Sequence, residues 1–328
     1  MKYVRLGKIG PLVSVIGIGL WQFGQGMWGR LQSSPREIVR AAIEKGINLF
    51  DTAEVYGSGL SEKILGEALR AEKVNREEVI IATKLAGFNA SNKERALRSL
   101  KASLQRLGTS YVDLYQIHWP PPKWCRLCDV LRGLEEAVET RLVRYIGLSN
   151  FSVKDIEEAR ACLRKYDIVS LQFQYSLAYR APEKELIPYL KRVGIGALAW
   201  SPLAKGALTG EIKKRNLARL TDTVYKKASR DTELLMKLRE MARNHASTPA
   251  QIALAWIIAK GAVPIPGARK VSHVLSNAKA AEITLSSDEV SVLDKVSAKY
   301  VGTYDGFSPI GRNVPCVIQR IMLRIMGI

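Results

Sequence analysis

The sequence predicts an α/β fold: a single-domain (β/α)8 barrel with an N-terminal β-hairpin and a C-terminal extension. Three observations indicate it. A length of 328 residues suits one large barrel. Eight short apolar runs alternate with longer amphipathic stretches. The apolar runs lack the polar alternation of half-exposed strands, as is typical of parallel strands buried on both faces. No G-x-G-x-x-G motif follows the first run, so a dinucleotide-binding open sheet is not indicated.

The elements are expected in a regular order. A hairpin over residues 2–13 precedes the barrel and closes its floor. Strands are expected at residues 15–19, 47–50, 79–83, 112–117, 144–149, 168–173, 195–200 and 262–266. Amphipathic helices are expected at residues 35–45, 61–71, 93–107, 153–165 and 248–260. No low-complexity linker interrupts this pattern, so residues 1–303 are predicted to form the barrel and residues 304–328 a separate tail.

Helix boundaries carry their own signals. Serine at a helix start satisfies exposed backbone N–H groups, and glycine past a helix end adopts the left-handed conformation easily. The expected N-caps are Ser34 (followed by Pro35), Ser61 and Ser152, and the expected terminating glycines are Gly46, Gly108 and Gly261.

Composition limits the class of protein. Hydrophobic residues make up 47% and charged residues 25%, which is ordinary globular composition. No apolar run is long enough to span a membrane, the N-terminus lacks a secretory signal, and four cysteines do not make a disulfide scaffold, so a reducing cytoplasm is predicted. The formal net charge of +19 favours anionic partners. Nucleic acid is the alternative, but no zinc-finger or RNA-recognition motif accompanies the charge.

Three consecutive predicted strands end in ionisable residues. Asp51, Lys84 and His118 follow the second, third and fourth strands, and Tyr56 comes five residues after Asp51. Each alone has an ordinary structural explanation. Together they lie on the rim where barrel enzymes place their chemistry. A carboxylate that holds a buried ammonium, which in turn lowers the pKa of a phenol, would make Tyr56 a proton donor. His118 would orient a carbonyl oxygen, and a cofactor must supply hydride.

These residues lie within motifs that resemble the aldo-keto reductases, NAD(P)H-dependent carbonyl reductases with a (β/α)8 barrel. The motifs are DTAEVYGSGLSEKILGEAL (51–69), IIATK (80–84), VDLYQIHWP (112–120), IGLSNF (146–151), LQFQYSL (171–177), WSPLAKGALTG (200–210) and PIPGARK (264–270). The resemblance covers residues 2 to about 287. It implies that Asp51, Tyr56, Lys84 and His118 form the catalytic tetrad of the family.

The resemblance also places the cofactor. The implied binding residues are Gly19, Leu20, Trp21, Asp51, Ser149, Asn150, Gln172, Trp200, Ser201, Pro202, Leu203, Lys205, Gly206, Gly267, Arg269, Lys270, His273 and Asn277. Of these, Ser149, Asn150 and Gln172 would bind the carboxamide and Trp200 would stack on the nicotinamide ring.

The loop that begins at Ser201 would cover the pyrophosphate. Its basic continuation through Lys213, Lys214 and Arg215 would account for part of the positive charge.

Cofactor preference follows from the adenosine end. Arg269 and Lys270 can bind a 2′-phosphate, which favours NADPH over NADH. His273 and Ser276 stand where many family members carry arginine or glutamine and then glutamate, so use of both cofactors stays open.

The substrate is expected to be a small carbonyl compound bound by Trp21, Tyr56, His118 and Trp119. Trp28 and Trp124 would add to the aromatic mouth of the site.

The cysteines carry no predicted catalytic role. Cys125 and Cys128 form one C-x-x-C, interpreted as incidental rather than as a zinc site, and no metal is predicted. Cys162 and Cys316 are interpreted as packing residues.

The C-terminal tail is the least familiar segment. Residues 314–328 have helical spacing, with Arg320 and Arg324 on the polar side, and predict a helix on the barrel or on a partner subunit. A helix on a membrane surface is the weaker option, because it would need more cations.

The sequence thus predicts a cytoplasmic NADP(H)-dependent enzyme that reduces aldehydes or ketones, with no nucleic-acid or membrane partner. The alternative is a cofactor-binding regulatory subunit that resembles the potassium-channel β subunits. The complete tetrad favours the enzyme.

Overall fold

The computed structural model describes residues 1–24, 31–123, 125–211, 219, 221–307, 309, 312–314, 318–319 and 321. Several residues singled out above lie outside this set: Trp28, Trp124, Lys213, Lys214, Arg215, Cys316, Arg320 and Arg324. Most of the predicted C-terminal helix lies outside it as well.

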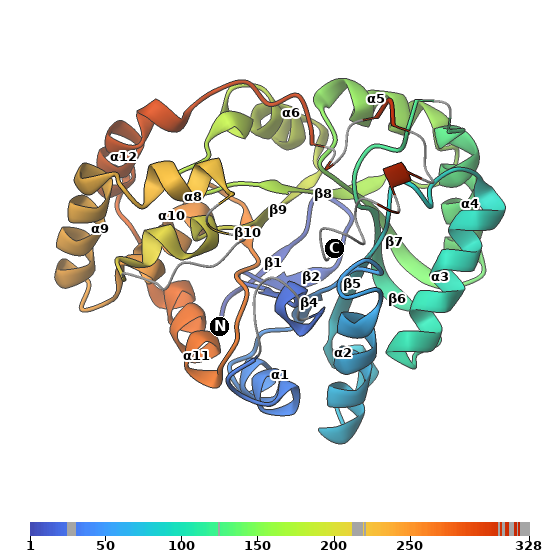
Figure 1. The fold of residues 1–328 in the computed structure, drawn as a ribbon, viewed down its shortest axis with the longest axis horizontal. Coiled ribbons are helices and arrows are strands. Elements are labelled where there is room, and N and C mark those ends of the chain that lie inside the picture. Colours follow the sequence, from blue (N-terminus) through green and yellow to red (C-terminus); the bar gives the residue numbers. More distant parts are fainter. Residues whose placement is uncertain are drawn as a thin grey trace.

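Eight parallel strands curl into a barrel, which confirms the predicted fold class (Figure 1). They are β3 (Ile18–Gly19), β4 (Leu49–Asp51), β5 (Ile80–Leu85), β6 (Val112–Ile117), β7 (Val143–Ser149), β8 (Ile168–Gln174), β9 (Gly196–Trp200) and β10 (Val263–Pro264). Each pairs with its neighbour in chain order. The first and last strands meet through hydrogen bonds from Gly17 N to Pro264 O, 2.9 Å, and from Gly19 N to Pro266 O, 3.1 Å.

Helices surround the strands in Figure 1. They are α1 (Pro35–Glu44), α2 (Leu60–Ala71), α3 (Lys93–Leu107), α4 (Leu127–Glu139), α5 (Val153–Cys162), α6 (Leu186–Val193), α8 (Thr223–Ala228), α9 (Thr232–Asn244), α10 (Pro249–Ala259), α11 (Val271–Lys279) and α12 (Ser287–Val296). Their apolar faces pack on the outer side of the sheet and form the main core.

Most predicted helix boundaries are confirmed. Ser34 and Ser152 form capping boxes at α1 and α5, and Gly46, Gly108 and Gly261 have the positive φ of a helix-terminating glycine.

Two predicted boundaries are wrong. α2 begins at Leu60 after Gly59, and the buried Ser61 hydroxyl instead donates to Leu20 O at 2.8 Å. α5 ends at Cys162, three residues early, because Leu163 is extended.

The N-terminal hairpin closes the barrel floor, as predicted. Strand β1 (Tyr3–Arg5) pairs antiparallel with β2 (Leu12–Ser14). Figure 1 shows both strands across the centre of the ring of helices. Leu6 and Val13 pack against inward-facing residues of the strands, such as Leu114 and Val169. Side chains therefore fill the barrel interior at the hairpin end, and the opposite rim is left for the site.

The interpretation of Cys128 and Cys162 as incidental or packing cysteines is wrong. The two form a disulfide between α4 and α5, with Cα atoms 4.8 Å apart. They are 34 residues apart in sequence, and the packing of α4 against α5 brings them together.

No helix among the described residues is both long enough and apolar enough to cross a bilayer.

Candidate active site

Three strand ends place the predicted catalytic residues together. Lys84 Nζ donates to Asp51 Oδ2 at 2.7 Å and to Thr52 O at 2.8 Å, and it lies 3.3 Å from the Tyr56 hydroxyl. Asp51 ends β4 and pairs in the sheet with Ala82 of β5, so their neighbourhood is fixed by backbone register. The loop after β4 then returns Tyr56 over the lysine. The sequence therefore brings a carboxylate, an ammonium and a phenol into one continuous hydrogen-bonded chain.

Lys84 is fully buried and still charged. Burial alone lowers the pKa of the Lys84 ammonium, but the attraction of Asp51 and the hydrogen bonds to Asp51 and Tyr56 outweigh it and raise the pKa above its usual value. An unpaired buried lysine would instead lose its proton. The Asp51 carboxylate is thus what keeps a positive charge beside Tyr56.

The pKa of Tyr56 differs from the expectation of a lowered value. Withdrawal of the hydroxyl from water raises the pKa of Tyr56, and the Lys84 ammonium offsets only part of this. The Asp51 carboxylate adds to the upward shift. The physical reason is that burial destabilises the phenolate more than one shared ammonium stabilises it. Tyr56 therefore keeps its proton at neutral pH and is available as a donor.

His118 follows β6 and is neutral at physiological pH. Burial, and then repulsion by the Lys84 ammonium, hold the pKa of His118 well below its usual value. Its ring meets the Tyr56 ring edge to face, with centroids 5.6 Å apart. The buried Nδ1 makes no hydrogen bond with the residues that the structure describes. A neutral imidazole beside the phenol can orient a polar group without competing for its proton.

Two glutamates behind the predicted catalytic residues were not predicted from the sequence. Glu62 accepts from Thr83 Oγ1 and from Arg106 Nε, both at 2.6 Å. Glu54 accepts from Ala86 N at 2.6 Å and from the Asn89 side chain at 3.0 Å. Both glutamates lie in the 51–69 motif already quoted, which was the available signal. Glu62 thus holds β5 at the residue before Lys84, and Glu54 holds the loop after β5.

The predicted carboxamide-binding residues form one network. Asn150 has a left-handed backbone, φ 65°. Its Nδ2 donates to His118 O at 2.9 Å and to Ser149 Oγ at 3.0 Å, while its Oδ1 accepts from Trp200 Nε1 at 2.9 Å. Gln172 donates from Nε2 to Asp51 Oδ1 at 2.7 Å. The four predicted residues are thus connected both to one another and to the Asp51–Lys84 pair.

The loop after β9 has an unusual backbone. Ser201, Ala204 and Lys205 have φ of 53°, 47° and 55°, and Gly206 has φ of 94°. Successive residues of this kind aim N–H groups into a concave, anion-binding surface, and such strain gathers at functional sites. The Lys205 ammonium pairs with Asp222 at 2.6 Å. The predicted pyrophosphate loop, which also contains Pro202 and Leu203, therefore has four residues with positive φ.

The predicted adenosine-binding residues surround the start of α11. Lys270 is the N-cap of α11. The Arg269 carbonyl accepts from Gln32 N at 2.7 Å and Ser33 N at 3.2 Å, which joins this segment to the loop before α1. His273 and the buried Asn277 lie on α11 itself. Two cationic residues thus precede a helix N-terminus, an arrangement that favours phosphate.

Arg219 was not predicted and lies near this end of the site. It is buried, and its Nε donates to Lys205 O at 3.1 Å. Burial, opposed by Tyr225 and reinforced by repulsion from Arg269, lowers the pKa of Arg219. The positive charge of Arg269 therefore acts on Arg219.

Two glycines leave room where the barrel closes. Gly19 pairs with Gly267 through an isolated bridge, and a Cβ on Gly19 would lie 2.8 Å from Ile265 O. Leu20 is buried, and its N–H donates to Asp51 O at 2.8 Å. A larger side chain at Gly19 would clash with the Ile265 carbonyl, so the close contact between the first and last strands requires glycine here.

Aromatic rings form one wall of the site. Trp21 stacks on Tyr56 with centroids 5.9 Å apart, and Trp119 lies 4.7 Å from His118 and 6.1 Å from Phe88. Trp119 is 3% exposed, so it lies deeper than a residue of the mouth itself. Phe88 was not predicted from the sequence.

The segment that precedes the predicted C-terminal helix reaches this site. Phe307 N donates to Asn150 O at 2.9 Å, and the Phe307 ring lies 6.2 Å from that of Trp200. Farther along, Arg312 pairs with Asp155 at 2.5 Å and donates to Pro121 O at 3.2 Å. The described part of the tail therefore lies across the loops after β6 and β7.

Known proteins resemble this chain over most of its length. The Aldo/keto reductase family model matches residues 15–298. An uncharacterized oxidoreductase of Mycobacterium tuberculosis is 37% identical over 308 residues, covering 89% of this chain and 92% of its own.

Solved structures agree. A thermostable aldo-keto reductase in complex with the inhibitor epalrestat has a TM-score of 0.76 and 34% identity, over 90% of this chain and 100% of its own. An aldo-keto reductase from Klebsiella pneumoniae in complex with NADPH has a TM-score of 0.72 and 28% identity, over 95% and 98%.

Proposed function

This chain belongs to the aldo/keto reductase family, and from that membership we propose that it is an NADPH-dependent oxidoreductase that reduces small aldehydes or ketones to alcohols. The observation that carries the proposal is the chain of hydrogen bonds from Asp51 through Lys84 to the Tyr56 hydroxyl at the open rim of the barrel. These hydrogen bonds place the proton of the Tyr56 hydroxyl where a carbonyl oxygen can bind.

Tyr56 is the proposed general acid. Its raised pKa keeps the phenol protonated until a stronger base, the oxygen of a carbonyl group under reduction, forms beside it. The phenolate left behind is then stabilised by the Lys84 ammonium 3.3 Å away. Asp51 acts one step farther back, because it holds Lys84 in place and charged.

His118 is proposed to hold the substrate oxygen. A neutral imidazole can donate one hydrogen bond, and its edge-to-face contact with Tyr56 places both groups on the same side of the site. Trp21 and Trp119 flank this pair and are proposed to select the substrate side chain, together with Phe307 from the tail.

The residues present fit a dinucleotide. Ser201, Ala204, Lys205 and Gly206, which have positive φ, form the loop that would hold the pyrophosphate. Gly19 and Gly267 would lie at the dinucleotide, where the first and last strands of the barrel meet. The carboxamide would bind at Ser149, Asn150 and Gln172. The Gln172 Nε2 already donates to Asp51, so its Oε1 would be the atom that accepts from the carboxamide.

Trp200 would cover one face of the nicotinamide ring, because its indole is fixed by Asn150. The reduced nicotinamide supplies the hydride that the carbonyl carbon accepts.

NADPH is proposed over NADH because of Arg269 and Lys270 at the start of α11, with Arg219 nearby. His273 and Asn277 would complete the adenosine site. The Klebsiella pneumoniae relative was solved with NADPH, which supports the same cofactor.

The test removes the Tyr56 hydroxyl and keeps the ring. Tyr56→Phe keeps the ring and its stacking on Trp21, so it is expected to bind NADPH like the wild type but to lose carbonyl reduction by about 10²–10⁴-fold. Cofactor binding is measured by calorimetry and turnover by NADPH oxidation over a panel of aldehydes, ketones and dicarbonyls. Tyr166→Phe, on the exposed surface, is the matched control.

Wild-type turnover in Tyr56→Phe would overturn the role of Tyr56. A wild-type protein that binds NADPH tightly but turns over no carbonyl in the panel would instead support the regulatory-subunit alternative.

A further inference from the structure

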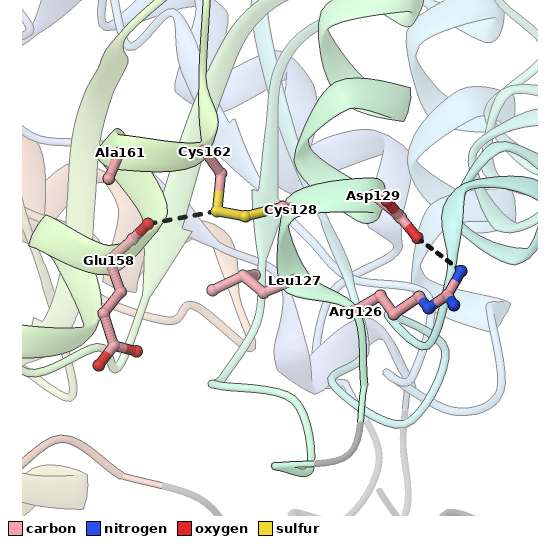
Figure 2. A pocket seen from close by; sticks show the side chains of 7 residues that line it. All are labelled: Arg126, Leu127, Cys128, Asp129, Glu158, Ala161 and Cys162. Carbon is pink, nitrogen blue, oxygen red and sulfur yellow. Dashed lines mark hydrogen bonds and ion pairs between the residues drawn. A yellow bond between two sulfur atoms is a disulfide. The ribbon is translucent and has the colours of Figure 1, made fainter.

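A disulfide on the outer surface joins two helices of the barrel. Cys128 lies in the first turn of α4, and Cys162 is the last residue of α5. Figure 2 shows the bond beside a surface pocket of about 620 Å³, which is also bordered by Glu158 and Ala161. Cys128 is exposed and Cys162 is half-buried. The bond is therefore within reach of thiols in solution.

A third cysteine, Cys125, lies three residues before Cys128 in the sequence and is not part of this disulfide. Cys125 N donates to Pro122 O at 2.9 Å, and Leu127 N donates to Cys125 O at 3.1 Å. The second bond closes a tight turn at Arg126, where φ is −85° and ψ is 79°. This turn leads from Cys125 directly into the first turn of α4, which contains Cys128 three residues later in the sequence.

We propose that Cys125, Cys128 and Cys162 form a thiol–disulfide exchange site, in which the covalent link moves between Cys128–Cys162 and Cys125–Cys128. The Cys125 thiol loses its proton to water, and its thiolate attacks Cys128 Sγ. The Cys125–Cys128 bond forms as the Cys128–Cys162 bond breaks, and Cys162 leaves as a thiolate that takes a proton from water. No electrons are gained or lost overall.

The exchange changes which segments of the protein the disulfide connects. The Cys128–Cys162 link closes a loop with a sequence separation of 34 residues that contains all of β7 and the Ser149–Asn150 segment. The Cys125–Cys128 link constrains only the turn that follows Trp119. Exchange therefore releases α5 from α4 while it tightens the loop that leads away from His118.

The experiment uses the full chain with Cys316→Ser, so that only the three cysteines of the site remain. The protein is equilibrated in glutathione buffers of graded redox ratio, quenched with acid, alkylated and cut after glutamate. This cleavage places Cys125 and Cys128 in one peptide, 95–135, and Cys162 in another, 159–183. The link between helices then appears as a cross-linked pair of peptides, whereas the link within 95–135 appears as one unalkylated peptide two hydrogens lighter than the dithiol.

Two results are expected. At redox ratios that leave one disulfide in the site, the parent protein shows both the cross-linked pair and the lighter 95–135 peptide with Cys162 alkylated, and their proportion does not change with the buffer because each species holds one disulfide. A further Cys162→Ser substitution yields the lighter peptide alone, whereas Cys125→Ser, the matched control, yields only the cross-linked pair.

Either of two outcomes would overturn the proposal. One is a parent protein in which Cys125 stays alkylated at every redox ratio, so that the disulfide is merely structural. The other is a parent protein without the cross-linked pair. Both are measured on a chain with all three cysteines, so they hold even if Cys162→Ser fails to fold.

Discussion

Trp200 donates a hydrogen bond from its indole Nε1 to Oδ1 of Asn150, at 2.9 Å. The same asparagine donates from Nδ2 to the carbonyl of His118. The end of β9 is thereby joined to the end of β7 and to the residue that follows β6. The proposed nicotinamide site and the proposed oxygen-binding histidine are therefore parts of one network.

Trp200→Phe should weaken NADPH binding. The variant keeps an aromatic face but leaves Asn150 Oδ1 without its donor, which costs about 1–3 kcal/mol, or roughly 5- to 150-fold in Kd. Calorimetric titration with NADPH measures it. Trp119→Phe is the control, because the Trp119 indole makes no hydrogen bond with the described residues, and its NADPH affinity should not change. Equal affinity in both variants would argue against the Asn150–Trp200 network.

Carbonyl reduction should hardly depend on pH around neutrality. The pKa of Tyr56 is raised and that of His118 is lowered well below its usual value, so between about pH 6 and about pH 9 the phenol stays protonated and the imidazole neutral. Reduction should fall only as the pH rises through the raised pKa of Tyr56, because the proton is then lost.

The reverse reaction, alcohol oxidation, needs the phenolate and should rise over the same alkaline range. Initial rates in both directions against pH provide the measurement, with the residual activity of Tyr56→Phe as the control that lacks the alkaline limb. A midpoint near pH 7 for reduction would mean that the Lys84 ammonium lowers the pKa of Tyr56 more than burial raises it.

Glu54 should stabilise the loop after Lys84. Glu54→Ala leaves Ala86 N–H and the Asn89 amide without their acceptor, and should lower the free energy of unfolding by about 2 kcal/mol. Glu54→Gln keeps an acceptor oxygen at the same place and should retain most of the stability. Urea unfolding curves compare the two variants. Equal losses would show that the charge of Glu54, rather than its hydrogen bonds, matters.

Arg269 should determine the preference for NADPH. Removal of one charge-assisted contact with a 2′-phosphate costs about 1.5–3 kcal/mol, so Arg269→Ala should lose roughly 10- to 100-fold in NADPH affinity and little in NADH affinity. Lys279→Ala, exposed at the far end of α11, is the matched control. A similar loss for both cofactors would place Arg269 on a part of the dinucleotide that they share.

Reduction of the Cys128–Cys162 disulfide should lower stability. A cross-link over a sequence separation of 34 residues lowers the conformational entropy of the unfolded chain, which raises the free energy of unfolding by about 3–4 kcal/mol. Thermal melting with and without a dithiol reductant measures the loss. The double variant Cys128→Ser, Cys162→Ser should melt like the reduced wild type and should not respond to the reductant. An equal melting temperature of the wild type with and without the reductant would argue against the Cys128–Cys162 disulfide.

The sequence was sufficient to predict the barrel and the proximity of Asp51, Tyr56, Lys84 and His118. Parallel strands buried on both faces read as apolar runs, and the register of such strands places their ends on one rim. Asp51, Lys84 and His118 follow consecutive strands, so their proximity needed only local patterns and the order of the strands.

Tertiary structure decided what depends on burial and on distant partners. No local pattern pairs Cys128 with Cys162 or brings Phe307 to Asn150, because both contacts join segments that lie apart along the chain. The direction of the Tyr56 pKa shift likewise follows from how much water the folded loops remove, which outweighs the nearby ammonium. Chain order thus determined which groups meet at the rim, and packing determined their ionisation and what covers them.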